Sequence, residues 1–354
     1  MNKKSITFAV SLISISFLHA DEADHNYEER LSALEKRTSV NEDAMRPNVC
    51  HWTKESYHFS FDASGLAWKA REDKLDFVIK SDDGLSNHAR TVRPDFEWDG
   101  GVKLAFGYHV PYYKMDVNLN WTHLTTDADR HVSASCGGNL YSIWSLPSAD
   151  LGPATDARSR WNLHLNILNF EMGGQFFPRR WLHLRPFIGL SSAWVRQKYD
   201  IDLSSASFSK DDIDMRNRFW GIGPRGGFDT IWEFGYGISA FGDVAVSILY
   251  GFFETRQKED VLFAGSSTKT PLLDERDSFR TSRTVLEYSL GLRWDRMFKN
   301  NRYHFGLQFG WDNLILYQQN ELKRFVDDVA IGVNLPVQGD LTIQGWSVKA
   351  MFGF

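Results

Sequence analysis

The chain has 354 residues, of which 14% are aromatic and 24% charged, and it contains two cysteines. So many aromatic residues exclude a disordered chain. The mean hydropathy of -0.37 excludes a bundle of membrane-spanning helices, because each needs about 20 consecutive apolar residues. The formal charge of -5 argues against a nucleic-acid-binding protein. A transmembrane β-barrel stays allowed, since its alternating lipid-facing and lumen-facing residues average to an ordinary hydropathy.

Residues 1–20 have the pattern of a secretory signal peptide. Lys3 and Lys4 form a positively charged start, an apolar run over residues 6–18 follows, and Ala20 precedes an acidic pair. The apolar run is short for a membrane span, so we expect cleavage near Ala20 and export of the mature chain.

Residues 21–55 are predicted to form a periplasmic segment that carries a short helix. Tyr27, Leu31 and Leu34 recur at helical spacing among charged residues. Two turns of this pattern are marginal in isolation, so the segment is either a solvated helix or a weak coiled-coil-like oligomerisation element. The barrel itself is expected over residues 56–354.

From residue 57 onward, the apolar residues recur with a period of two. Between residues 113 and 121 they alternate with Lys114, Asp116 and two asparagines, which places every apolar side chain on one face of a strand. We assign the apolar set at 161, 163, 165 and 167 to the lipid-facing side in the same way. Ten strands are predicted, over residues 57–69, 97–108, 112–124, 159–175, 181–201, 214–233, 237–255, 282–297, 302–318 and 340–354. Residues 75–79 also alternate, and a hairpin there would make twelve strands.

The connections between these strands alternate in length. Tight turns are predicted at 109–111, 177–180, 234–237 and 298–301, and long polar loops at 70–96, 125–158, 202–213, 256–281 and 319–339. Outer-membrane barrels show this asymmetry between periplasmic turns and extracellular loops. The apolar faces are about ten residues long, which suits a tilted membrane strand. The predicted fold is therefore an all-β, antiparallel, up-and-down transmembrane β-barrel.

Several sequence blocks resemble one known family. They are LRPFIGL at 184–190, FWGIGPR at 219–225, LYG at 249–251, LGLRW at 290–294 and RYH at 302–304. In this order they resemble the pore-forming outer-membrane proteins typified by the Legionella major outer-membrane protein and found in chlamydia-like bacteria. The resemblance implies a barrel in a Gram-negative outer membrane with porin-like activity, no catalytic residues and no cofactor. It also implies that the terminal Phe354 is an aromatic signal for the barrel-assembly machinery.

Strand phase selects the residues expected to line the lumen. They are Lys103, Lys114, Asp116, His183, Arg185, Glu287, Arg293 and Lys349. Such charges set the barrier for a passing ion, although each could instead form an ion pair that braces the wall. The predicted function is a porin-like channel for passive diffusion of small hydrophilic solutes or ions. A ten-stranded barrel leaves little free lumen, so the alternative is a structural or adhesive barrel acting through its long loops.

Other motifs carry less weight. The G-x-G-x-x-G pattern at 221–226 contains Pro224 and continues as a strand, so we interpret its glycines as a bend rather than a dinucleotide site. The histidines are scattered without metal-ligand spacing. Asp127, Asp129 and His131 are interpreted as a solvated loop rather than a protease site at the barrel rim, and no enzyme is predicted.

The two cysteines are expected on opposite sides of the membrane. Cys50 falls in the periplasmic segment and Cys136 in an external loop, so a disulfide between them would require the N-terminal segment to thread the lumen. Disulfides to envelope neighbours are the hypothesis, and free thiols the alternative. The expected partners are outer-membrane lipid, the barrel-assembly machinery and a second copy or a disulfide-linked neighbour, but no nucleic acid.

Overall fold

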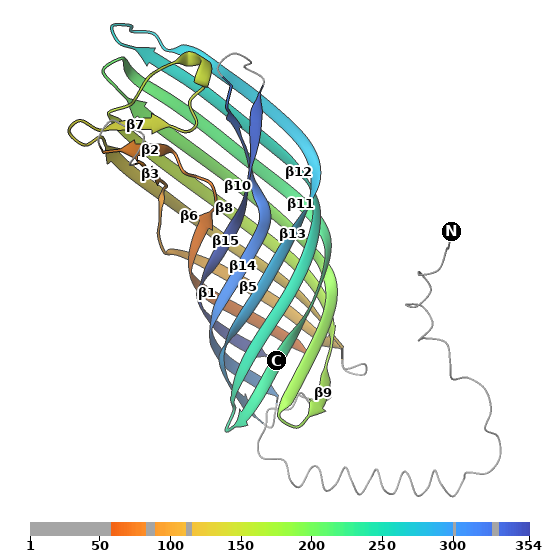
Figure 1. Ribbon diagram of the computed structural model, residues 1–354. Coiled ribbons are helices and arrows are strands. Elements are labelled where there is room, and N and C mark those ends of the chain that lie inside the picture. Colours follow the sequence, from red (N-terminus) through yellow and green to blue (C-terminus); the bar gives the residue numbers. More distant parts are fainter. Residues whose placement is uncertain (1–57, 83–88, 111–114, 300–301, 328–332) are drawn as a thin grey trace, which may run out of the picture. The chain divides into compact units, whose positions relative to one another are not determined.

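The computed structural model describes residues 58–82, 89–110, 115–299, 302–327 and 333–354. These residues form a closed ring of ten antiparallel strands (Figure 1). The ring strands are β1 (Phe59–Glu72), β5 (Asp99–Val110), β6 (Met115–Ser133), β8 (Asp156–Gly174), β10 (Leu182–Ser204), β11 (Phe208–Gly235), β12 (Ile238–Phe263), β13 (Thr270–Phe298), β14 (Tyr303–Phe325) and β15 (Asn334–Gly353). β1 pairs with β5 on one side and with β15 on the other, which closes the ring. The prediction of an all-β barrel of ten strands is confirmed.

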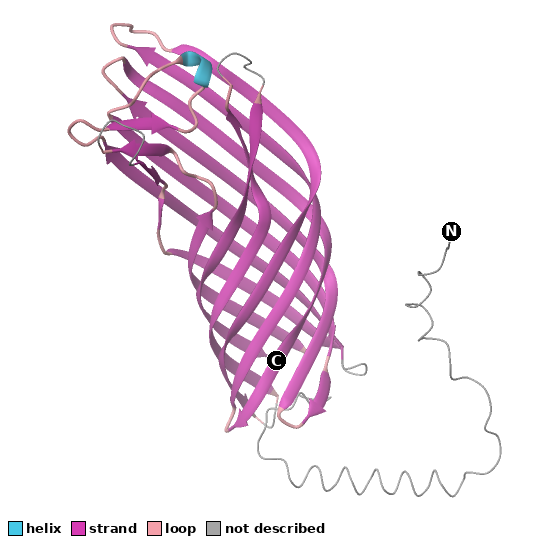
Figure 2. Ribbon diagram, viewed as in Figure 1, coloured by secondary structure: helices cyan, strands magenta, loops and turns pink. Residues whose placement is uncertain are grey.

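The remaining short elements are not part of the ten-stranded ring (Figure 2). They are β2 (Val78–Ser81), β3 (Ala89–Val92), β4 (Asp95–Phe96), β7 (Asn139–Ser142), β9 (Phe176–Arg179) and the 3-10 helix η1 (Pro147–Ala149). β4 pairs with β6 and β9 with β10, whereas β3, β2 and β7 form a separate three-stranded sheet. The alternating segment at 75–79 therefore does not extend the wall, and a twelve-stranded ring is wrong. No helix in the described ranges is long and apolar enough to cross a membrane.

Some predictions fall on residues outside the described ranges. These are the signal peptide, the helix within residues 21–55, Cys50 and Lys114. They stay predictions.

The connections differ between the two ends of the barrel. One end has short turns, as predicted, and there Phe354 donates its backbone N–H to the Phe59 carbonyl at 2.9 Å. At the other end, the loops predicted at 202–213, 256–281 and 319–339 are mostly strand, and the links shrink to 205–207, 264–269 and 326–333. In these stretches inward-facing and outward-facing residues alternate as they do in the belt, but many of the outward-facing residues are charged. In the sequence they therefore resemble polar loops.

An apolar belt covers the outer face of the ring near the short turns. On β15, Trp346, Val348 and Phe352 are exposed while Ser347 and Met351 are buried. On this outer face, aromatic side chains mark the edge of the belt toward the long connections: Trp121, Trp194, Trp220, Phe252 and Trp346. Along each strand the belt is about ten residues long, which is the span of a tilted strand through a bilayer.

Beyond the belt, the two faces of the wall exchange polarity. On β8, Phe170 and Met172 face outward, whereas Trp161, Leu163 and Ile167 are buried inside. β8 pairs with both of its neighbours without a register shift, so the pleat keeps its phase and the apolar residues change from even to odd positions. The prediction that positions 161–167 face lipid is therefore wrong. Outside the membrane the wall meets water on its outer face, so burial favours apolar residues inside.

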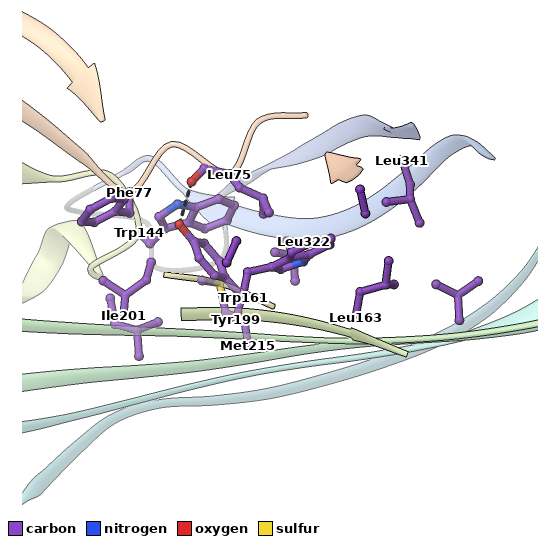
Figure 3. Packing of buried hydrophobic residues seen from close by; sticks show 14 of the residues in the cluster. Leu75, Phe77, Trp144, Trp161, Leu163, Tyr199, Ile201, Met215, Leu322 and Leu341 are labelled. Atoms are coloured by element: carbon purple, nitrogen blue, oxygen red, sulfur yellow. Dashed lines mark hydrogen bonds between the residues drawn. The ribbon is translucent and has the colours of Figure 1, made fainter. Parts of the chain in front are cut away.

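The interior beyond the belt is a hydrophobic core (Figure 3). Leu75 and Phe77, from the connection after β1, and Trp144, from the connection after β7, pack against Tyr199 and Trp161 of the wall. We call the described residues of the connections from β1 to β5 and from β6 to β8, namely 73–82, 89–98 and 134–155, the loop plug. The expected polar lumen therefore occupies only the part of the barrel inside the belt.

Candidate functional site

A cavity of about 270 Å³ with many charged residues in its lining lies inside the barrel at the level of the apolar belt. Its lining includes seven of the predicted lumen residues: Lys103, Asp116, His183, Arg185, Glu287, Arg293 and Lys349. They come from β5, β6, β10, β13 and β15, and the inward phase of each strand brings them together. Their role as pore-lining residues stays a prediction.

Arg185 ties together three strands of this wall. From β10 it donates Nε to the Asp116 carboxylate on β6 at 2.7 Å and Nη1 to the Asp229 carboxylate on β11 at 2.6 Å. Gly173 on β8 leaves the required space, because a Cβ at that position would lie 2.6 Å from the Arg185 Nε. Charge-assisted bonds of this kind are strong in a low-dielectric interior, so Arg185 braces the barrel.

Arg225 makes a second buried cluster beside the first. It donates Nε to Glu171 at 2.9 Å and Nη2 to Glu287 at 3.1 Å, which links β8 to β13 through β11. The Phe187 ring lies between the two guanidinium groups, 5.3 Å from Arg185 and 5.7 Å from Arg225. Both arginines are therefore held in one position by carboxylates and by an aromatic ring.

Three further charged or titratable residues of the lining are paired as well. Arg293 donates Nε to the Asp295 carboxylate at 2.6 Å, and His304 Nε2 lies 2.6 Å from the other oxygen of the same carboxylate. His183 Nε2 lies 3.0 Å from Glu233. These pairs fit the bracing alternative for the predicted residues that make them.

Lys103 and Lys349 differ from this pattern. Among the described residues, neither has a carboxylate within 4 Å. They lie on β5 and β15 on either side of β1, where both are opposite Ser64 in the ladders. Asp62 and Asp243 line the same cavity. Both lysines are attracted electrostatically to these two carboxylates, but among the described residues they make no direct ion pair.

Sequence reasoning missed part of the lining. Arg225, Glu171, Asp229, Asp62 and Asp243 also face the cavity. Each lies at an inward position of a strand whose outward phase is clear from its aromatic and aliphatic residues, so strand phase could have found them. Arg225 lies inside the G-x-G-x-x-G pattern, and β11 runs through that pattern as an uninterrupted strand with no helix after it.

The predicted rim residues do not converge on a cleft. They lie on the outer face of β6, where Asp129 is 3.4 Å from Arg158 and His131 is 3.8 Å from Asp156. No group of metal-ligating residues occurs in the described part of the chain. Cys136 is an exposed free thiol, and its disulfide partnership stays a prediction. The same holds for the assembly role of Phe354.

The loop plug closes the cavity toward the long connections. Trp144 donates its indole N–H to the Asp76 carbonyl at 2.7 Å, and the Tyr199 hydroxyl donates to the Leu75 carbonyl at 2.6 Å. The Trp144 and Tyr199 rings pack edge to face with centroids 6.3 Å apart. The plug is thus bonded to itself and to the wall.

Two wall carboxyl groups also hold the plug. Glu259 accepts a hydrogen bond from the Leu146 backbone N–H at 2.9 Å, and Asp211 accepts one from the Ser145 hydroxyl at 2.8 Å. Burial, followed by the charge of Asp211, raises the pKa of Glu259 to about 8. Burial likewise raises the pKa of Asp211 to about 6. Both groups lie beyond the belt, where the protonation state of the plug contacts can follow the external pH.

Residues 52–354 match the sequence profile of the family described as the Legionella pneumophila major outer membrane protein precursor. The chain belongs to this family. The family and the closed barrel identify a bacterial outer-membrane β-barrel protein, with the apolar belt in the bilayer. No curated protein matches the chain.

Solved structures with a similar fold are remote. The outer membrane protease OmpT from Escherichia coli is 10% identical, with 84% of this chain and 97% of that chain covered and a TM-score of 0.43. OprG from Pseudomonas aeruginosa is 12% identical, with 85% and 97% covered and a TM-score of 0.25. A FadL homologue from Pseudomonas aeruginosa is 7% identical, with 85% and 90% covered and a TM-score of 0.27. Likenesses this remote carry no argument about function.

Proposed function

We propose that the protein is an outer-membrane channel for passive diffusion of small hydrophilic solutes or ions. The observation that carries the proposal is the charged cavity at belt depth, because ionisable groups inside a membrane are expensive and usually mark a solute path. Bracing explains the paired residues, but it does not explain Lys103 and Lys349, which have no carboxylate within 4 Å among the described residues.

The loop plug makes this channel a gated one. Around the plug the interior is closely packed, with apolar side chains and buried polar groups such as Glu259, so no open path for a hydrated ion remains while the plug is docked. Passage therefore requires the plug to move away from Tyr199 and Glu259. Loops that make few backbone hydrogen bonds to the strands of a barrel open locally at a low free-energy cost.

The cavity favours cations over anions. Seven carboxylates and five arginine or lysine side chains line it within the described residues. The excess is small, so we expect a modest preference.

Reconstitution into planar bilayers tests the channel. The refolded full chain should show discrete current steps, with long closed periods set by the plug. Insertion confirmed by protease protection, but without any current at any applied voltage, would contradict the channel.

A structural or adhesive barrel is the second candidate. It is favoured by the dry core, which fills the interior beyond the belt, and by the long hairpins β10–β11 and β12–β13, which continue past the belt. A silent barrel whose loop deletions abolish attachment to host cells or to envelope partners would support this candidate.

A further inference from the structure

The outer face of β10 to β13 carries a layered arrangement of charge directly beyond the apolar belt. On β10 to β12 the last aromatic residues of the belt are Trp194, Trp220 and Phe252, which pair side by side across the strands. The next outward position on β10 is Arg196, and it lies directly opposite Arg218 on β11. Cations directly opposite each other on neighbouring strands repel, so this pair is unfavourable without an anion between them.

The following row of outward positions is basic as well. Lys198, Arg216, Arg256 and Arg276 pair with one another in an unbroken line from β10 to β13. We call this row, together with Arg196 and Arg218, the basic band. Four like charges side by side repel one another, so they need anions next to them.

A row of aspartates lies on the side of the basic band that is farther from the belt. It neutralises the row that begins with Lys198, but not Arg196 and Arg218. Lys198 lies 2.7 Å from Asp200, and Arg256 lies 3.0 Å from Asp274. Arg218 has only a weak, exposed contact with Glu254 at 3.6 Å, and Arg196 has no carboxylate within 4 Å in the described part of the chain. The positive charge that is left over therefore lies next to the bilayer.

A polar groove continues the band toward β6. It lies on the outer face between the two belt tryptophans Trp121 and Trp194, and it is lined by His123, His164, Asn166 and Arg196. His123 bonds the Asn166 side-chain oxygen at 2.9 Å and stacks on Trp121. Below the groove, the exposed Phe170 and Met172 of β8 face the acyl chains. A cationic groove above an apolar track suits a molecule with an anionic head and a hydrocarbon tail.

We propose that Arg196 and Arg218, with the groove beside them, bind the phosphate groups of an anionic lipid in the outer leaflet. The occupant is a bilayer lipid rather than a soluble anion, because the row with two arginines and the single carboxylate Glu254 adjoins the belt, while the row of aspartates lies farther from it. Each cation near an anionic lipid surface contributes about 1 kcal/mol, which is about fivefold in affinity. The site does not depend on whether the barrel conducts.

Lipid titration of the full-length refolded protein tests the proposal. The protein is held in neutral detergent, and adducts with phosphatidylglycerol and phosphatidylcholine are counted by native mass spectrometry. The Arg196→Ser/Arg218→Ser variant should bind phosphatidylglycerol about fivefold to thirtyfold more weakly, with binding of phosphatidylcholine unchanged. The matched control is Lys69→Ser/Arg71→Ser, which removes the same charge from the outer face of β1.

Three results would overturn the proposal. One is an unchanged affinity of the Arg196→Ser/Arg218→Ser variant for phosphatidylglycerol. Another is an equal loss in the control variant, which would mean that only total charge matters. The third is displacement of the lipid from the native protein by inorganic phosphate at the same concentration, which would identify a site for soluble anions. Heat-modifiable migration on gels verifies that each variant keeps a closed barrel.

Discussion

Replacing Trp144 with alanine is expected to open the lumen by weakening the docking of the loop plug. The Trp144 side chain is 2% exposed, packs against Tyr199 and donates a hydrogen bond to the Asp76 carbonyl. Truncation of a buried tryptophan to alanine costs about 3–5 kcal/mol. Applied to the docking equilibrium, this loss multiplies the population with an open plug by about a hundredfold to several thousandfold. Even if half of the loss is absorbed elsewhere, the rise exceeds about tenfold.

Single-channel recording in planar bilayers measures this rise as open probability. The size of each current step should stay close to that of the native protein, because the charged cavity at belt depth is untouched. The matched control is Trp346→Ala, which removes the same side chain from the outer face, where Trp346 is 47% exposed to lipid. An open probability equal to that of the native protein, in a variant that still migrates as a closed barrel, would refute the plug as the gate.

Three further predictions concern the cavity and the plug contacts. The variant Lys103→Gln/Lys349→Gln should increase the permeability of cations relative to anions by about fivefold, measured as a reversal potential in a salt gradient, because it removes two positive charges that make no direct ion pair among the described residues and leaves the carboxylates of the lining in place. Arg225→Met should destabilise the barrel by about 3–5 kcal/mol in urea titrations, since it leaves Glu287 buried without its partner, and replacing its carboxylate partners by glutamine should recover part of the loss. The raised pKa of Glu259 means that docking of the plug is strongest below about pH 4.5 and weakens as the pH rises through about 8, so open probability should increase over that window in the native protein but much less in Glu259→Gln.

The strand count and the closed ring could be predicted from the sequence because the belt imposes a simple rule. Wherever the outer face meets lipid, every second residue is apolar, as at Trp346, Val348 and Phe352. The same rule located seven residues of the cavity lining, since the inward phase follows once the outward phase is known. The same rule would also place Arg225 in the lining, but the glycine pattern at 221–226 led only to the interpretation of a bend.

The dry core could not be predicted by the same rule, because it depends on where the membrane ends. On β8 the apolar residues change from even to odd positions near Ile167, without any bulge in the strand. Taken alone, positions 161–167 look like another lipid-facing strand segment. The unshifted pairing with β6 and β10 shows that β8 keeps the same alternation from Phe170 to Trp161. Because Phe170 points outward, these odd-numbered residues point inward.

The plug was hidden for a different reason. Leu75 and Trp144 come from connections far apart in the sequence, and they meet only because both fold back into the barrel. The hydrogen bonds that hold the plug join groups remote along the chain: Glu259 accepts from the Leu146 backbone N–H, and the Leu75 carbonyl accepts from the Tyr199 hydroxyl. Local periodicity contains no information on contacts of this kind.

The solvent outside the wall thus determines what the wall can hold inside. At the level of the belt, the apolar residues of each strand face lipid, so its polar residues must face inward. The carboxylates among them need partners such as Arg185 and Arg225. Beyond the belt the outer face meets water, so apolar residues are buried inside and pack around the loop plug, together with polar groups such as Glu259 that bond to it. A solute that crosses this barrel meets charged groups in the membrane and a dry barrier outside it. In the proposed channel the barrier to transport therefore lies in the part of the barrel that leaves the bilayer, where the plug and the buried Glu259 also lie.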